Sequence, residues 1–455
     1  MTAAKVVAGE RRWVVERGDC LDLMRTLPDE SMDAIVTDPP AGVAFMGSDW
    51  DSDKGGRDLW IAWLAERFAE AFRVLKPGGY AVVWGLPRTS HWTATALENA
   101  GFEVRDRLAH WFGSGFPKSL DPETAATLAG RPYPNPDPAA YELIDWAKTE
   151  RAGWGTALKP ACEDWHLVRK PPRGPVIKNA RALGTGLINV EGCRVPHASP
   201  ADLADHTAGV DAIKARGGVF DNSWANDSDL SGANDVSAAG RWPSHLLLSH
   251  APGCELTGTR KVKAAPSWYA TDREPALFTG AECSEIIHGD GDGFETVEAW
   301  ACVDGCPVKA LDGLEGGDAS RFFSTFAPFF YGPKAGRQER ERGCEYLTPT
   351  VVDEAHPPGS LGANSPRAGA GRKSKRRNFH PTVKSLDLMR WLCRLVCPPG
   401  GVVLDMFTGS GSTGVACSAE GFRFVGFEAD DAFAEIARAR IIGDAPLLNI
   451  GGGAM

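Results

Sequence analysis

Residues 402–414 read VVLDMFTGSGSTG, an apolar strand pattern followed by a glycine-rich turn and the start of a helix. Gly409 and Gly411 allow the chain to turn tightly and let a ligand approach the backbone. The free amide groups at the start of the helix can bind an anionic group. Glu428 ends the next strand, about twenty residues further on, where a carboxylate accepts hydrogen bonds from ribose hydroxyls. The pattern predicts a nucleoside-cofactor site that includes Asp405 and Phe407, and a purely structural turn is the alternative.

Both ends of the chain alternate strand and helix patterns. We expect strands at 13–16, 33–37, 80–84, 102–107, 402–405 and 424–428, and helices at 20–27, 59–75, 91–100, 386–397, 412–420 and 432–441. From about residue 113 to residue 374 the periodicity fades, and only 139–149 and 245–249 read as short elements. We therefore expect an α/β domain formed by residues 1–112 and 378–455, with residues 113–377 inserted as a loop-rich lobe.

The composition is that of a globular protein, with 43% hydrophobic and 24% charged residues. No stretch approaches about eighteen consecutive apolar residues, so we expect a cytoplasmic protein without a membrane segment. The formal net charge of −10 argues against a protein that coats nucleic acid, although a DNA enzyme needs only a local basic face. The one dense charge block, residues 372–377, can also be a solvated linker. The 11 scattered cysteines indicate reduced thiols.

A second motif, Asp38-Pro39-Pro40, follows the apolar strand expected at 33–37. The prolines would hold a rigid turn at the carboxyl end of the sheet, where open α/β sheets bind ligands. Asp38 would then be a fixed acceptor that holds an exocyclic amino group and orients its lone pair toward a methyl donor. A strand stopped by prolines, with Asp38 as a cap, is the structural alternative.

Three motifs in a fixed order give the chain a family resemblance. They are Thr37-Asp38-Pro39-Pro40-Ala41-Gly42, His380-Pro381-Thr382-Val383-Lys384-Ser385 and Phe407-Thr408-Gly409-Ser410-Gly411. In this order the chain resembles the β class of DNA amino-methyltransferases, which methylate adenine N6 or cytosine N4. Arg17-Gly18-Asp19-Cys20, Gly115-Phe116-Pro117-Lys118-Ser119 and Trp242-Pro243 extend the likeness to the phage-like members of that class. The resemblance implies a Rossmann-like sheet of seven strands that binds S-adenosylmethionine, with an inserted target-recognition lobe.

The resemblance also assigns roles to single residues. S-adenosylmethionine would be contacted by Phe407, Gly409, Gly411 and Glu428, with Asp19 and Cys20 near its adenine and Thr382 and Lys384 near its methionine moiety. Asp38 would hold the target amino group. Ser385 replaces a proline of the family, a change of little expected consequence.

Ala41 replaces the aromatic residue on which the flipped base stacks in the family. Loss of that platform costs roughly 1–3 kcal/mol, which is on the order of a 10- to 100-fold loss of rate. Three explanations stay open: Phe45 or Trp50 supplies the stack, the enzyme is inactive, or the pocket is reshaped for another atom or base. Methylation of cytosine C5 is one form of the third explanation and would need a thiolate such as Cys20.

The inserted lobe contains two similar turns, His250-Ala251-Pro252-Gly253-Cys254 and Cys302-Val303-Asp304-Gly305-Cys306. His250, Cys254, Cys302 and Cys306 together offer a closed tetrahedral set for a structural zinc ion. Cys283 is a substitute ligand if His250 is not one, and four incidental core residues are the alternative. A zinc ion would explain how a lobe with so little periodicity stays folded.

DNA contacts are expected where aromatic and cationic side chains alternate, because base flipping needs both. Besides Phe45 and Trp50, the candidates are Trp111, Phe112, Lys118, Arg321, Phe322, Phe323, Lys334, Arg337 and Arg340. The same mixture from Arg321 to Arg342 would also suit a helix that packs against the sheet.

The sequence thus predicts a site-specific methyltransferase acting on double-stranded DNA, with adenine N6 as the first choice because an aspartate precedes the two prolines. Cytosine N4 or C5 methylation is an alternative. A DNA-binding relative weakened in catalysis by Ala41 is the rival from another class, and an RNA or protein methyltransferase is a third. A homodimer and a partner restriction enzyme are both left open.

Overall fold

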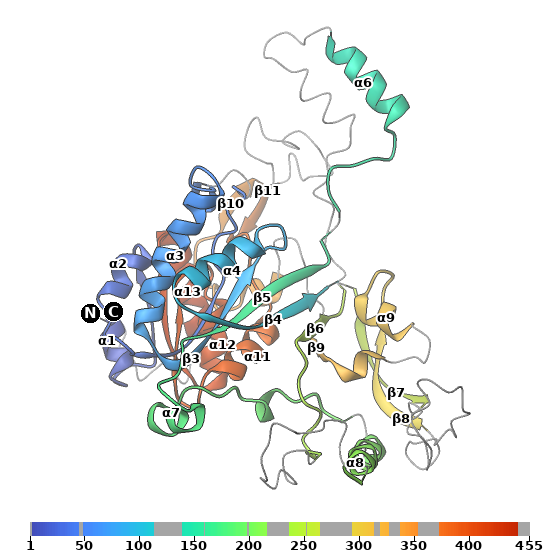
Figure 1. Cartoon of the computed structure of the whole chain (residues 1–455). Helices are drawn as coiled ribbons and strands as arrows, with labels where there is room; N and C mark the ends of the chain where they lie inside the picture. Colours follow the sequence, from blue (N-terminus) through green and yellow to red (C-terminus); the bar gives the residue numbers. More distant parts are fainter. Residues whose placement is uncertain are drawn as a thin grey trace.

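A computed structural model describes residues 2–44, 49–112, 139–158, 160–197, 200–215, 236–251, 253–263, 294–313, 319–326, 337–353 and 373–444 (Figure 1). The helices are α1 (Thr2–Val7), α2 (Cys20–Arg25), α3 (Arg57–Val74), α4 (Ser90–Asn99), α6 (Ala139–Glu150), α7 (Val176–Leu183), α8 (Pro200–Ala215), α9 (Pro307–Asp312), α10 (Arg337–Glu341), α11 (Leu386–Val396), α12 (Ser412–Glu420) and α13 (Asp431–Asp444). Short 3-10 turns are η2 (Asp49–Asp51), η3 (Glu191–Cys193) and η4 (Ala319–Phe322).

The strands are β1 (Trp13–Arg17), β2 (Met32–Thr37), β3 (Leu75–Gly85), β4 (Glu103–Trp111), β5 (Cys162–Arg169), β6 (Leu246–Ser249), β7 (Glu255–Lys263), β8 (Phe294–Ala301), β9 (Ser324–Phe326), β10 (Thr350–Asp353), β11 (Lys373–Arg376), β12 (Val402–Asp405) and β13 (Arg423–Glu428). Nine of them form one sheet in the order β1-β13-β12-β2-β3-β5-β4-β6-β9. Strands β7 and β8 form a separate antiparallel pair, and so do β10 and β11.

The first five strands of the sheet run parallel, and helices cover both of its faces. Alternate residues of one strand serve the two faces, because side chains in a strand alternate in direction. In β2, Ala34 and Val36 pack with α11 and α12, whereas Ile35 packs with α3. Strands β2 and β12 are consequently buried at every position, as expected for a parallel sheet covered on both faces.

The sheet differs from the expected one in its strand count. The resemblance implied seven strands from residues 1–112 and 378–455, but β5, β6 and β9 of the nine-stranded sheet come from the middle of the chain. Strand β5 lies between β3 and β4 and pairs antiparallel with both. The count of seven is therefore wrong, and residues 113–377 contribute to the sheet in addition to forming a lobe.

Part of the basic block at 372–377 is a β-strand and not a linker, since β11 pairs with β10. Among the described residues, no helix is both long and apolar enough to cross a membrane.

Candidate active site

The carboxyl ends of β13, β12 and β2 lie side by side and open into a cavity of about 510 Å³. Parallel strands present their carboxyl ends at the same edge, so residues far apart in the sequence meet there. The cavity is lined by Asp19, Cys20, Asp38, Pro40, Thr382, Lys384, Asp405, Phe407, Gly409 and Glu428 among the predicted residues. Residues from both ends of the chain thus share one cavity.

Asp405 organises the turn that follows β12. Its buried carboxylate accepts hydrogen bonds from Thr37 Oγ1 at 2.7 Å, from Thr413 Oγ1 at 2.6 Å and from the backbone N–H of Phe407 at 3.1 Å. Burial raises the pKa of Asp405 to about 6, against the opposing effect of these hydrogen bonds. Asp405 therefore joins β12, β2 and α12, and shapes the glycine turn as well as lining the cavity.

Glu428 lies opposite the glycine turn and forms a hydrogen bond with it. One carboxylate oxygen accepts the backbone N–H of Gly409 at 2.7 Å, and the other accepts that of Asp430 at 2.9 Å. Burial raises the pKa of Glu428. Gly409 has φ +51°, and a Cβ atom there would lie 2.7 Å from Nε2 of His380. The turn therefore has no room for a side chain at Gly409.

Gly411 has a structural role at the start of α12. It does not line the cavity; it is the N-cap of α12 at φ +79°, and a Cβ atom there would lie 2.9 Å from Cα of Ala437 in α13. The missing side chain at Gly411 thus allows α12 and α13 to approach, and a contact of this residue with the cofactor stays a prediction.

Asp19 and Cys20 begin α2 at the cavity wall. Asp19 caps the helix by accepting the N–H of Leu21 at 2.8 Å, and its other oxygen pairs with Arg67 at 3.0 Å. Burial, with a further contribution from Asp19, raises the pKa of Cys20 to about 12. The Cys20 thiol therefore stays protonated, which is unsuitable for the thiolate that C5 methylation would need.

Asp38 and Lys384 form the charged centre of the cavity. Their side chains meet at 3.1 Å between Nζ and Oδ2, and the Lys384 ammonium lies 4.1 Å from the centre of the Trp84 ring. Burial raises the pKa of Asp38, whereas Lys384 opposes that rise. Burial by itself would lower the pKa of Lys384, but Asp38 and Glu163 hold it above its ordinary value. Lys384 therefore remains protonated beside Asp38.

Ala41 is only 9% exposed and packs in the hydrophobic core. Buried Asp51 accepts the backbone N–H groups of Ala41 and Gly42, and Thr89 Oγ1 donates to the carbonyl of Ala41 at 2.8 Å. The bonds to Asp51 attach the loop after Asp38 to η2, which carries Trp50, and the bond from Thr89 attaches it to the N-cap of α4. Trp50 lines the cavity and is 43% exposed.

A sequence model described as DNA methylase, for transfer to N6 and N4 amino groups, matches residues 32–181 and 196–439 of the chain. The chain belongs to this DNA methylase family. Its members are amino-methyltransferases, so the family does not support the C5 alternative. The match includes the Asp38 loop, the Lys384 segment and the glycine turn, which the structure brings together around one cavity.

Two curated relatives share parts of the chain. The type II methyltransferase M.BamHI of Bacillus amyloliquefaciens is 28% identical over 134 residues, which is 30% of this chain and 28% of that protein. The putative methylase YubD of Escherichia coli (strain K12) is 38% identical over 97 residues, 20% of this chain and 40% of that protein. The matched stretches thus span less than half the length of either relative.

Two solved structures align with nearly the whole chain at low similarity. PvuII DNA methyltransferase (cytosine-N4-specific) covers 97% of this chain and 91% of its own, with 11% identity and a TM-score of 0.42. The M1.HpyAVI-SAM complex covers 94% and 99%, with 12% identity and a TM-score of 0.34. Family membership rests on the matched sequence, not on these scores.

The predicted DNA contacts of this methylase differ in whether the structure describes them and in how exposed they are. Phe45, Lys118 and Lys334 lie outside the described residues, and for Arg321, Phe322 and Arg337 only the backbone is described. Arg340 is buried and donates to the carbonyl oxygens of Asn378 (2.8 Å) and His380. Phe112 is also buried, so Phe112 and Arg340 are wrong as surface contacts, whereas Phe323 is partly buried against the core of the lobe and stays a prediction. Trp111 remains a candidate at 42% exposed.

Several cavity residues were missed by the sequence interpretation, among them Trp63 and Arg67 of α3, and Lys54. The Arg67 guanidinium lies 4.2 Å and the Lys54 ammonium 4.9 Å from the centre of the Trp63 ring. Trp63 also lies 6.2 Å from Phe407, centre to centre. Trp63 and Arg67 lie four residues apart on α3, a spacing found in any helix with one face toward the core. This spacing carries no signal that would set the two residues apart from core residues.

The four predicted metal ligands come together in the lobe. The ligand atoms of His250, Cys254, Cys302 and Cys306 all lie within 4.8 Å of one another. Cys283, the substitute ligand, lies outside the described residues.

Proposed function

We propose that the protein transfers a methyl group from S-adenosylmethionine to an exocyclic amino group of a base in double-stranded DNA, with adenine N6 as the acceptor. The observation that carries the proposal is that Asp38, at the end of β2, faces the same cavity as the glycine turn and Glu428. A methyl donor held by the turn and an amino group held by Asp38 would be neighbours. The aspartate before the two prolines supports adenine over cytosine.

The residues present fit S-adenosylmethionine. A cavity of about 510 Å³ lies within the usual range for small-molecule sites. A carboxylate suited to ribose hydroxyls, Glu428, lies beside an aromatic wall of Phe407 and Trp63 and next to the side-chain-free position Gly409. When bound, S-adenosylmethionine supplies an electrophilic methyl group on a sulfonium. Asp19, Arg67 and Glu428 would hold its polar parts.

Asp38 and Lys384 perform the positioning. Ionised Asp38 accepts a hydrogen bond from the base amino group, which turns the nitrogen lone pair away from the carboxylate and toward the methyl donor. Lys384, which pairs with Asp38 and lies over Trp84, keeps that carboxylate in place and ionised. Transfer would form the N–CH3 bond, break the S–CH3 bond to leave a neutral thioether, and give the nitrogen a positive charge; Asp38 would accept the proton that the nitrogen then loses.

Trp50 supplies the stacking surface that Ala41 lacks. Both the exposed ring of Trp50 and the Asp38 carboxylate line the cavity, and Asp51 anchors the turn that carries Trp50 to the loop after Asp38. Ala41 itself is buried and held on both its N–H and its carbonyl. An aromatic ring at position 50 can therefore do what an aromatic ring at position 41 does in the family.

The test is product analysis. Purified protein is incubated with S-adenosylmethionine and unmodified mixed-sequence duplex DNA, which is then digested to nucleosides for mass spectrometry. We expect N6-methyladenine from the wild type and none from Asp38→Ala, with cofactor binding by calorimetry retained in both. N4-methylcytosine would overturn the choice of base. No methylated nucleoside, with cofactor and DNA both bound, would overturn transfer in favour of a DNA-binding relative.

A further inference from the structure

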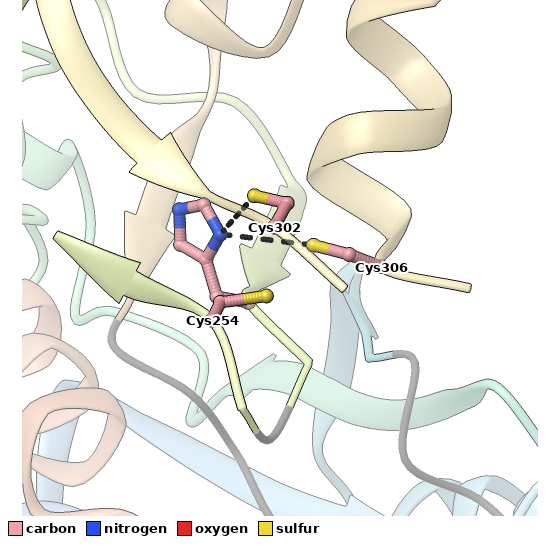
Figure 2. Close-up of side chains that lie close together, drawn as sticks. Cys254, Cys302 and Cys306 are labelled. Carbon is pink, nitrogen blue, oxygen red and sulfur yellow. Dashed lines mark hydrogen bonds between the residues drawn. The ribbon is translucent and has the colours of Figure 1, made fainter. Parts of the chain in front are cut away.

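The cluster of His250, Cys254, Cys302 and Cys306 lies outside the methylase cavity and is brought together from two segments (Figure 2). Nδ1 of His250 is 3.4 Å from Sγ of Cys302 and 3.6 Å from Sγ of Cys306. All three cysteines are free thiols. We propose that these four side chains bind one structural zinc ion, which fixes the inserted lobe to the edge of the nine-stranded sheet.

The distances match the edges of a zinc tetrahedron. Zinc bonds of about 2.3 Å to sulfur and about 2.05 Å to nitrogen give tetrahedral edges of about 3.5 Å between nitrogen and sulfur and about 3.8 Å between two sulfurs. The two measured nitrogen–sulfur distances fall on either side of the first value. The mutual separation of all four ligand atoms, within 4.8 Å, leaves a small adjustment for closure around an ion.

The backbone shows the same turn in both segments. The N–H of Cys254 donates to the carbonyl of Ala251 at 3.1 Å, and the N–H of Cys306 donates to that of Val303 at 3.3 Å. The residue before each of these cysteines is a glycine with positive φ, +92° at Gly253 and +79° at Gly305. Two segments about fifty residues apart thus present their ligand pairs in the same way, which a chance gathering of core residues does not require.

Each ligand adjoins an element of secondary structure. His250 follows β6, Cys254 precedes β7, Cys302 follows β8, and Cys306 is the N-cap of α9. The His250 ring stacks on Trp300 of β8 with centroids 4.0 Å apart, and its backbone N–H donates to the carbonyl of Phe326 in β9 at 3.1 Å. One ion would therefore join four elements, and the histidine is already oriented by its neighbours.

The apolar core of this part of the lobe is small. Its buried members are Leu248, Ala251, Cys254, Cys306 and Val308, so two of them are proposed ligands. A core of that size buries too little apolar surface to order the β7–β8 pair by itself. Metal binding contributes directly to folding free energy in such lobes. The zinc ion would supply the stability that the core lacks.

The experiment is a metal analysis of the full chain, purified without chelators or added metal. We expect one zinc ion per chain by inductively coupled plasma mass spectrometry, and a loss of most of that zinc in the double variant Cys302→Ser, Cys306→Ser. Cys162→Ser is the matched control, because Cys162 is a partly buried cysteine of β5 outside the cluster, and it should keep its zinc.

A second measurement serves if the double variant does not fold. Cobalt exchanged into the wild-type protein should give the intense visible bands of a tetrahedral site and thiolate-to-cobalt charge transfer. Folded wild type without zinc and without these bands would overturn the proposal, as would equal zinc in wild type and double variant. The site does not rest on methyl transfer: a protein with zinc and no methylated nucleoside, or the reverse, separates the two proposals.

Discussion

We expect Asp38 and Lys384 to make turnover sensitive to pH. Burial raises the pKa of Asp38, so this carboxyl takes up its proton at a higher pH than an ordinary aspartate, and the protonated form would be a weaker acceptor for a hydrogen bond from the base amino group. Activity therefore falls as the pH decreases through that pKa. Because Lys384 opposes the rise, Lys384→Met should move the acid limb of the kcat–pH profile to higher pH.

Lys384→Arg is the control for this prediction, because it keeps a cation beside Asp38. Each profile is normalised to its own plateau, so that a general loss of activity does not imitate a shift. An acid limb at the same pH in the wild type and in Lys384→Met would show that Lys384 does not tune Asp38.

Trp50 can be tested by removing its ring. Trp50→Ala should lower kcat/KM for duplex DNA about 10- to 100-fold, because stacking of roughly 1–3 kcal/mol is lost. Trp50→Phe retains a ring and should lose much less. Unchanged kcat/KM in Trp50→Ala, measured at saturating S-adenosylmethionine, would place the stacking surface elsewhere.

Helix α12 is bounded by two glycines in the left-handed region, and comparing substitutions at the two positions tests how closely this helix packs against α13. Gly411 and Gly421 both have φ +79°, but a Cβ atom would lie 2.9 Å from Ala437 at Gly411 and meets nothing within 4 Å at Gly421. Both alanine variants lose about 1–2 kcal/mol to the left-handed conformation. Gly411→Ala should lose about 1–3 kcal/mol more through overpacking against α13.

Urea unfolding of the two variants measures this difference directly. Equal losses of unfolding free energy at Gly411 and Gly421 would mean that α12 and α13 can separate at no cost, contrary to the close contact seen here.

Some helices and strands could be predicted from the sequence, and others could not. Strands β2, β12 and β13 follow an apolar pattern, and their predicted bounds differ from the observed ones by at most one residue at either end. Strand β5 reads CEDWHLVR and was missed, although it is almost entirely buried. Its polar residues have partners supplied by other elements: Ser90 Oγ donates to Asp164 at 2.7 Å and lies 3.3 Å from His166. Periodicity cannot detect a buried strand whose polar groups are satisfied from a distance.

Across the whole molecule, the sequence motifs predicted which of their own residues would meet in the cavity, but not which side chains of other elements would complete it. Asp38, Lys384, Phe407 and Glu428 meet because each adjoins the carboxyl end of a parallel strand or the segment packed over it. Trp63 approaches the same cavity from the middle of α3, and its contribution depends on how that helix lies on the sheet. Such a placement is a property of tertiary packing, which no local pattern encodes.

The order of the strands in the sheet also determines when the sheet can be completed as the chain is synthesised. Strands β12 and β13 lie between β1 and β2, so the earliest strands made are separated by the latest ones. A nascent chain can pair β2 with β3, but β1 has no neighbour in the sheet until residues 402–428 have left the ribosome. The same residues carry the glycine turn and Glu428. The loop at Asp38 is therefore translated early, but the cavity that it lines is incomplete until residues 402–428 have been made.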